Sequence, residues 1–480
     1  METKTREIID RFEQINAIPR CSKNEQAICR WLQQWAKHNG FSVRSDTAGN
    51  MVISVPAAGG MDGGPMVVIQ GHVDMVCEKR AGSGHDFDAD PVRHVVEGDW
   101  LRAEDTSLGA DNGIAIAIGM VLAESRDVPH PPLELLFTVD EETGLTGVKE
   151  LPDDLLTGSL MLNLDSEEEG VFTVGCAGGR DATLTLAVER TPADGPWNGL
   201  ALTAGGMQGG HSGIDIIKQR ANANKVLVRC LDQLRRRIPL RLVDLAGGTV
   251  HNAIPREATA RFLHPVGEAE RIAQLVAGFE KEIRSEFGTI EPTLSITLTD
   301  AASDPALTET ATGRAIDFLA ALPSGVANMA ADLDKLVETS SNLAVMRLGN
   351  DALTVRSSQR SSVASRLEEI CSRVSAVARL AGAELHWRNA YPPWTPDLEA
   401  PLLQRCRQVY ADLFGRQPEV RVLHAGLECA VIGALYPEMA MISFGPTIEN
   451  PHSPDERLHL PSVERVWRFL TALMGDFHSR

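Results

Sequence analysis

Four short apolar runs stand out in the pattern of hydrophobic and polar positions along the chain. Their length and aliphatic content are typical of strands buried on both faces. Acidic residues or a histidine follow each run, where the chain leaves the end of the expected strand. The runs, each with the polar residues that follow it, are 66–69 with His72 and Asp74, 132–139 with Glu141 and Glu142, 160–164 with Asp165, and 439–444 with His452.

Helical patterns alternate with these strands, which predicts a largely parallel α/β sheet flanked by helices. One predicted helix, residues 113–123, is directly preceded by Asp111. Ligands of such sheets bind beyond the carboxyl ends of the strands, and the polar residues of all four runs fall there. We therefore expect six side chains to meet at this edge of the sheet: His72, Asp111, Glu141, Glu142, Asp165 and His452.

Each of these residues alone has a simpler interpretation. His72 could be a core histidine satisfied by Asp74, and Asp111 could be an ordinary helix N-cap worth roughly 1 kcal/mol. The three adjacent carboxylates at 140–142 are harder to explain, because they repel one another unless a cation lies among them. Two histidines with three or four carboxylates exceed the needs of one ion and suit a dinuclear site, whose mixed ligands favour Zn²⁺, Co²⁺ or Mn²⁺.

The pattern changes in the middle of the chain. Residues 179–387 contain alternating strands and helices without the acidic strand ends of the first part, which indicates an inserted α+β domain. A proline-rich stretch, 391–397, is expected to return the chain to the first domain. The predicted organisation is a first domain of residues 1–178 and 388–480 around an inserted domain of residues 179–387.

Length and charge narrow the class of protein. At 480 residues the chain is too long for one ordinary core, which favours two domains. The net charge of −19 argues against nucleic acid or an anionic membrane as partner and suits cations and small soluble molecules. We see no signal-peptide pattern, and the longest apolar helical run is too short to span a bilayer. We therefore expect a cytoplasmic protein.

The eight cysteines are scattered and form no Cys-x-x-Cys pair. This usage is typical of free thiols in a reducing compartment, and it offers no cysteine-rich zinc site.

Five motifs, taken in order, resemble the metallopeptidase family that holds carboxypeptidase G, the aminoacylases, carnosinase and bacterial dipeptidases. Three further motifs are similar to those of the bacterial dipeptidases in this family that act on Xaa-His. The five are GHVD (71–74), GADNG (109–113), DEETG (140–144), NLD (163–165) and PHS (451–453), and the three are GGHSG (209–213), GGTVHNAIP (247–255) and HAGLEC (424–429).

The resemblance implies a di-zinc-peptidase-like fold with residues 179–387 as a lid and dimerisation domain. It implies two Zn²⁺ per subunit, with Co²⁺ or Mn²⁺ as possible substitutes. The implied ligands are His72 and Asp165 at one ion and Glu142 and His452 at the other, with Asp111 bridging both.

The resemblance also implies the remaining roles. Asp74 orients His72, and Glu141 is the general base that acts on a water molecule bridging the two ions. His211 stabilises the oxyanion, in its own subunit or from a neighbouring one. The implied substrate-binding residues are Asn252, Arg356 and Glu428, with Arg360 competing with Arg356 for the substrate carboxylate.

These roles imply a dipeptidase that hydrolyses unblocked dipeptides, including Xaa-His, and a homodimer is expected by analogy. An N-acyl amino acid deacylase or a tripeptide aminopeptidase would use the same acids, so the motifs at the sheet do not separate these activities. A metal-binding scaffold without turnover is the non-enzymatic alternative. An intact Glu141 argues against it, because a structural metal site does not need an unliganded base.

Overall fold

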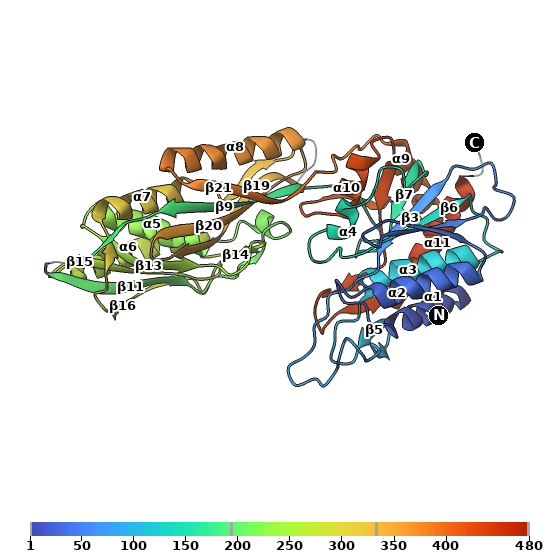
Figure 1. Ribbon diagram of the computed structural model, residues 1–480, viewed down its shortest axis with the longest axis horizontal. Coiled ribbons are helices and arrows are strands. Elements are labelled where there is room, and N and C mark those ends of the chain that lie inside the picture. The colour runs from blue at the N-terminus through green and yellow to red at the C-terminus, as the bar shows by residue number, and fades with distance from the viewer. Residues whose placement is uncertain (1, 193–194, 332–334, 478–480) are drawn as a thin grey trace. The chain divides into compact units, whose positions relative to one another are not determined.

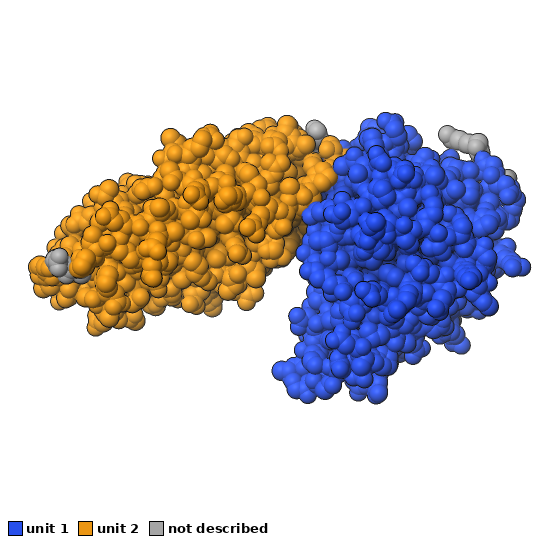
Figure 2. All heavy atoms as spheres, in the orientation of Figure 1, with its two compact units in different colours: residues 1–176, 396–422, 427–480 blue, residues 177–395, 423–426 orange. Residues whose placement is uncertain are grey.

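The computed structural model describes residues 2–192, 195–331 and 335–477 (Figure 1). The chain divides into two compact units, coloured separately in Figure 2. Unit 1 comprises residues 1–176, 396–422 and 427–480, and unit 2 comprises residues 177–395 and 423–426. The sequence analysis predicted the two domain boundaries after residues 178 and 387. It assigned residues 423–426 to the first domain, whereas they group with unit 2.

Unit 1 is built on an eight-stranded mixed sheet in the order β1-β2-β6-β3-β7-β23-β8-β22. The four central strands β6, β3, β7 and β23 are parallel to one another, whereas the outer strands β2 and β8 pair with them antiparallel. This mixed, mainly parallel centre confirms the predicted α/β class. The strands of this sheet are β1 (Ser42–Ser45), β2 (Met51–Val55), β3 (Val67–His72), β6 (Leu133–Thr138), β7 (Leu160–Asn163), β8 (Val171–Cys176), β22 (Glu419–Leu423) and β23 (Ala440–Ser443).

The helices of unit 1 pack around this sheet. All residues of β3 and β6 are buried, as their apolar sequences predict. Helix α3 is buried along most of its length, because it packs on β3 and is covered by α1. The helices are α1 (Thr3–Asn16), α2 (Gln26–His38), α3 (Ala110–Glu124), α4 (Thr146–Lys149), α9 (Pro401–Phe414), α10 (Glu428–Leu435) and α11 (Leu460–Asp476).

A small four-stranded sheet forms where the sequence suggested only loops, between residues 77 and 107. It has the order β24-β25-β5-β4 and joins this region to the two strands on either side of His452. Its strands are short and mostly exposed or half-buried, so they carry little hydrophobic pattern. They are β4 (His94–Glu97), β5 (Trp100–Ala103), β24 (Ile448–Glu449) and β25 (Arg457–His459).

Unit 2 is an α+β domain, as predicted, with a nine-stranded sheet in which neighbouring strands are antiparallel. Its strands are β9 (Gly178–Ala187), β11 (Trp197–Gly205), β13 (Arg241–Gly247), β15 (Ala258–Pro265), β16 (Ser295–Ala301), β18 (Gly325–Met329), β19 (Val337–Leu348), β20 (Ala352–Ser361) and β21 (Glu384–Tyr391). Residues of this sheet and of the four helices form one hydrophobic core. The helices are α5 (Ala223–Arg235), α6 (Ala269–Phe287), α7 (Glu309–Ala321) and α8 (Ala364–Ala381).

Short elements complete unit 2. They are β10 (Arg190–Thr191), β12 (Gly210–His211), β14 (Ala253–Ile254), β17 (Ala306–Leu307) and the 3-10 helix η1 (Ile216–Lys218). In the described ranges of the chain, none of the helices has the length and apolar character needed to span a membrane.

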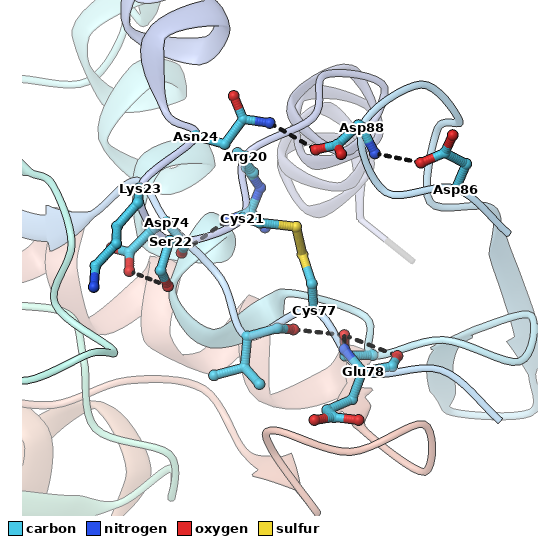
Figure 3. The surroundings of a disulfide bond; sticks show 12 residues. Arg20, Cys21, Ser22, Lys23, Asn24, Asp74, Cys77, Glu78, Asp86 and Asp88 are labelled. Atoms are coloured by element: carbon cyan, nitrogen blue, oxygen red, sulfur yellow. Dashed lines mark hydrogen bonds between the residues drawn. A yellow bond between two sulfur atoms is a disulfide. The ribbon is translucent and has the colours of Figure 1, made fainter. Parts of the chain in front are cut away.

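Cys21 and Cys77 form a disulfide, so the expectation of free thiols is wrong for these two cysteines (Figure 3). The bridge joins the loop between α1 and α2 to the loop that follows β3. Next to it, Ser22 donates a hydrogen bond to the Asp74 carboxylate. The disulfide therefore fixes two segments beside the strand end that carries His72.

Replacing both Cys21 and Cys77 with serine is expected to lower the free energy of unfolding by about 4 kcal/mol, because the bridge closes a long loop in the unfolded chain. The two cysteines are 56 positions apart. Urea unfolding under non-reducing conditions measures the difference. Cys29→Ser, which removes a thiol outside the bridge, is the control. Equal stability of the double variant and the wild type would contradict the prediction.

Candidate active site

The six side chains predicted to meet at the sheet edge lie together in unit 1. His72 is the last residue of β3, and Glu141 and Glu142 follow the end of β6. Asp165 follows β7, and Asp111 is in the first turn of α3. Since β3, β6 and β7 are parallel neighbours, their carboxyl ends bring these residues to one edge. The turn between β24 and β25 supplies His452.

The first group of donor atoms is centred on His72, whose side chain is 1% exposed. Its Nε2 lies 3.1 Å from Asp111 Oδ1 and 3.4 Å from Asp165 Oδ1. One nitrogen and two carboxylate oxygens at this spacing are a suitable set of ligands for a divalent transition metal.

The second group is centred on His452, whose Nε2 lies 3.0 Å from Asp111 Oδ2 and 3.0 Å from Glu142 Oε2. Asp111 thus turns one carboxylate oxygen to each group, which is the arrangement of a bridging carboxylate. The second oxygen of Glu142 is buried and has no hydrogen-bond partner among the described residues. The donor set fits two ions that share Asp111.

The electrostatics of these residues also favour cations. Burial and, to a lesser extent, the nearby Asp111 carboxylate raise the pKa of Glu142 to about 7. Burial likewise raises the pKa of Asp165 to about 6 and that of Glu141 well above its ordinary value. Neighbouring acids add to both shifts. Bound cations would relieve this repulsion and let all these carboxylates ionise together.

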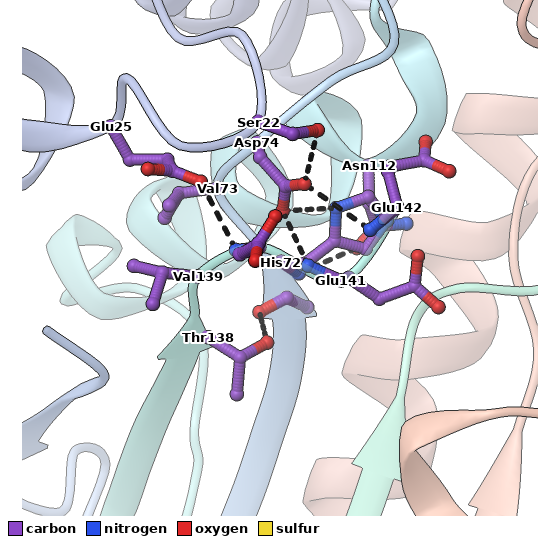
Figure 4. A network of polar contacts seen from close by, with 12 residues as sticks. Ser22, Glu25, His72, Val73, Asp74, Asn112, Thr138, Val139, Glu141 and Glu142 are labelled. Carbon is purple, nitrogen blue, oxygen red and sulfur yellow. Dashed lines mark hydrogen bonds and ion pairs between the residues drawn. The ribbon is translucent and has the colours of Figure 1, made fainter. Parts of the chain in front are cut away.

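Asp74 connects the first group to the loop after β6 (Figure 4). It is completely buried, and its Oδ1 lies 3.3 Å from His72 Nδ1. Its carboxylate accepts hydrogen bonds from the backbone N–H groups of Glu141 and Glu142 and from the Ser22 hydroxyl. Asp74 therefore faces the His72 ring and is hydrogen-bonded to the backbone of both glutamates, a position from which it can orient the ring.

Glu141 differs from its neighbour Glu142. Its carboxylate lies near His72 and Glu142, but it accepts no hydrogen bond from any residue that the structure describes. Its backbone is fixed, because the N–H donates to Asp74 and the carbonyl accepts from the N–H groups of Gly144 and Leu145. An uncommitted carboxylate beside the two donor groups is suited to exchange a proton with a bound molecule.

In unit 2 the structure brings His211 and Asn252 together, although they are 41 positions apart. β12 pairs with β14, so His211 is opposite Ala253, and the backbone N–H of Ser212 donates to the carbonyl of Asn252. The His211 Nδ1 accepts hydrogen bonds from the N–H groups of Gly213 and Ile214. When the ring is neutral, its proton therefore resides on Nε2, and this nitrogen is the hydrogen-bond donor of the ring.

The two arginines of β20 differ in their surroundings. Arg356 is exposed, whereas Arg360 is 8% exposed and donates through Nη1 to the Tyr391 hydroxyl at 2.7 Å. The Arg360 Nε has no hydrogen-bond partner among the described residues. Glu428 is completely buried in unit 1, which does not favour its predicted contact with a substrate ammonium group.

A model of peptidase family M20/M25/M40 matches residues 68–476. The chain is a member of this family. It is 38% identical over 472 residues to the cytosol non-specific dipeptidase of Escherichia coli (strain K12), a match covering 98% of this chain and 97% of that protein. These matches confirm the family resemblance of the sequence motifs.

Solved structures agree with the family assignment. Aminoacylhistidine dipeptidase from Vibrio alginolyticus is similar with a TM-score of 0.90 and 38% identity, over 98% of this chain and 96% of that chain. An aminopeptidase from Bacillus cereus ATCC 10987, at 15% identity and a TM-score of 0.58, covers 98% of both chains and shares the fold.

The sequence analysis did not identify three residues that form hydrogen bonds around the site of this peptidase. Glu456 is buried and accepts hydrogen bonds from four consecutive backbone N–H groups, residues 108–111. Arg20 is buried and donates to the carbonyls of Val73, Asp74 and Gly109. Asn112 joins the ends of β3 and β7 through its amide. All three act on backbone groups, which leave no trace in a sequence pattern.

This peptidase also has a buried histidine, His424, in unit 2. Its Nε2 lies 2.8 Å from the Ser340 hydroxyl. Burial lowers the pKa of His424 to about 3, and the nearby Arg360 and His211 contribute. Protonation is therefore disfavoured in the folded protein.

We expect this histidine to make stability pH-dependent. Its pKa in the folded protein is below the unfolded value, so its contribution is full above about pH 6.5 and is lost as the pH falls towards 3. Between pH 7 and pH 5 the loss should be roughly 2 kcal/mol. Urea unfolding of the wild type and of His424→Gln at both pH values measures it. An equal loss in the two proteins would contradict the prediction.

Proposed function

We propose that this enzyme is a metal-dependent dipeptidase that hydrolyses unblocked dipeptides, including Xaa-His. The main support is the pair of donor groups that share Asp111, in a chain that matches a dipeptidase over 98% of its length. The name of that relative also supports a cytoplasmic location.

The proposed metal ligands are His72 and Asp165 for one ion, Glu142 and His452 for the other, and Asp111 for both. The mixed nitrogen and oxygen donors suit two Zn²⁺, with Co²⁺ or Mn²⁺ as substitutes. Ions bound there would lower the pKa of a water molecule and polarise the carbonyl of the scissile amide.

Glu141 is the proposed general base. Its carboxylate is the uncommitted one beside the donor groups, and Asp74 holds its backbone in place. It would take the proton from the attacking water molecule and return it to the nitrogen of the leaving amine. This exchange completes hydrolysis without any other acid.

His211 is proposed to stabilise the oxyanion that forms at the carbonyl oxygen. Its Nδ1 is engaged by two backbone N–H groups, so its Nε2–H is the donor that such a role requires. It would act in its own subunit or from a neighbouring one, and we propose a homodimer.

Asn252 and Arg356 are the proposed substrate-binding residues. Asn252 is adjacent to the strand pair that carries His211, and Arg356 is an exposed guanidinium suited to a bidentate contact with a substrate carboxylate. Arg360 is the alternative for that contact. Its guanidinium is buried, and no carboxylate of the described residues lies within ion-pair distance of it. A direct substrate contact by Glu428 is not part of this proposal.

Hydrolysis of three matched substrates by the Zn²⁺-loaded enzyme tests the proposal. The substrates are a free Xaa-His dipeptide, the same dipeptide N-acetylated, and a tripeptide. Cleavage of the free dipeptide alone is expected. Preference for the acetylated substrate would indicate a deacylase, and preference for the tripeptide would indicate an aminopeptidase. No cleavage with both ions bound would support a scaffold without turnover.

A further inference from the structure

Beneath the donor groups of unit 1 lies a cluster of polar side chains that the proposed mechanism does not use. Gln70, Thr138, Asn163 and Glu428 are each 0% exposed. The first three come from the ends of β3, β6 and β7, which are otherwise largely apolar strands. Glu428 is the first residue of α10. We call these four residues the Glu428 network.

Hydrogen bonds connect all four residues of the Glu428 network. Glu428 Oε2 accepts from Gln70 Nε2 at 2.6 Å and from the Thr138 hydroxyl at 2.6 Å. Gln70 in turn accepts from the Asn163 amide, and Asn163 Oδ1 accepts from the backbone N–H of Asp165. The network thus reaches the backbone of a proposed metal ligand.

The positions of these residues relate directly to the site. Gln70 precedes His72 by two residues, and Asn163 precedes Asp165 by two, while Thr138 precedes Glu141 by three. Each of the three strands therefore has a hydrogen-bonded polar residue two or three positions before a proposed metal ligand or the proposed base. Burying a carboxyl group costs free energy unless the group is hydrogen-bonded. An apolar side chain would fill the same space at lower cost, so packing alone does not explain a glutamate at position 428.

The segment before Glu428 strengthens the argument. Residues 423–426 group with unit 2, whereas Leu427 and α10 group with unit 1. The HAGLEC motif thus holds one buried polar anchor in each unit, His424 against Ser340 and Glu428 against the strand ends. The rest of the proposed function does not account for this motif.

We propose that Glu428 is a positioning residue: by accepting hydrogen bonds from Gln70 and Thr138, it fixes the strand ends that carry His72, Glu141 and Asp165. The inference rests on the proposed function for its activity measurements. It acts through other residues and touches neither substrate nor metal.

The test compares Glu428→Ala with Glu428→Gln in the full-length enzyme, using zinc affinity from competition with a chromophoric chelator and steady-state kinetics. Outer partners of metal ligands typically contribute 10–100-fold. Glu428→Ala should therefore weaken zinc binding and lower kcat by about 10-fold or more, with KM little changed. Glu428→Gln keeps an acceptor oxygen and should recover most of the loss. Glu438→Gln, at an exposed position after the same helix, is the matched control.

Gln70→Leu provides a second variant that acts from the other side of the network. It should weaken zinc binding in the same direction, and it keeps the test decisive if Glu428→Ala does not fold. The double variant Glu428→Ala with Gln70→Leu should lose less than the sum of the two single losses, because the residues share one interaction.

Two results would overturn the proposal. One is unchanged zinc affinity and unchanged kcat in both Glu428→Ala and Gln70→Leu. The other is a rise in KM for the free dipeptide, equal in Glu428→Ala and Glu428→Gln with zinc affinity intact, which would indicate a contact with the substrate ammonium group. If the wild-type enzyme cleaves no dipeptide, the proposed function fails, while the zinc measurements still decide the role of Glu428.

Discussion

Replacing Glu141 with glutamine is expected to lower kcat about a thousandfold while zinc binding remains intact. The amide has nearly the shape of the carboxylate but does not accept a proton, and a general base contributes roughly 10²–10⁴-fold. Zinc binding should persist because the proposed ligands are other residues, and because Asp74 holds residue 141 through its backbone N–H. Steady-state hydrolysis of a free dipeptide and metal analysis of the dialysed protein measure the two quantities.

Glu150→Gln, an exposed position on the same segment, serves as the control and should retain wild-type activity. Turnover of Glu141→Gln within a few-fold of the wild type would contradict the proposed base. A loss of one ion in Glu141→Gln would instead make Glu141 a ligand and exchange its role with that of Glu142.

Replacing Asp111 with alanine is expected to remove both ions, because its two oxygens face the two donor groups. Affinity for each ion should fall at least about a hundredfold, more than the loss of a typical outer partner, and activity should fall with it. Asp165→Ala is the matched comparison. It removes a ligand from the His72 group only, so this variant should retain one ion per chain.

Metal content after dialysis against a fixed zinc concentration distinguishes these outcomes. Asp111→Ala should hold no ion under conditions in which the wild type holds two. If Asp111→Ala and Asp165→Ala each retained one ion, Asp111 would belong to one group and would not bridge.

The sequence predicted which side chains lie together where polar residues follow the ends of buried strands. The apolar runs of β3, β6, β7 and β23 are short and wholly or partly buried, so their hydrophobic pattern is clear. The residues that follow these runs lie at the same edge of the sheet. The pattern fails in unit 2, where residues 339–342 of β19 are buried although they are polar. A buried strand segment with polar side chains has no hydrophobic signal, so the pattern does not identify this part of β19.

Supporting residues were beyond prediction for a different reason. Arg20 and Glu456 hold backbone groups of distant segments, and such contacts depend on the fold alone. Cys21 and Cys77 also come together only in the folded chain. By contrast, motif order carried the resemblance, because each motif contains the residue proposed to act.

The two donor groups differ in how far they are open to solvent. The His72 side chain is 1% exposed, whereas that of His452 is 47% exposed. An ion held by His72 and Asp165 would be enclosed by the strand ends. An ion held by His452 and Glu142 would be more open to solvent and would therefore dissociate faster. Depletion of metal would proceed in two kinetic phases, and the intermediate would be an enzyme that keeps only its inner ion.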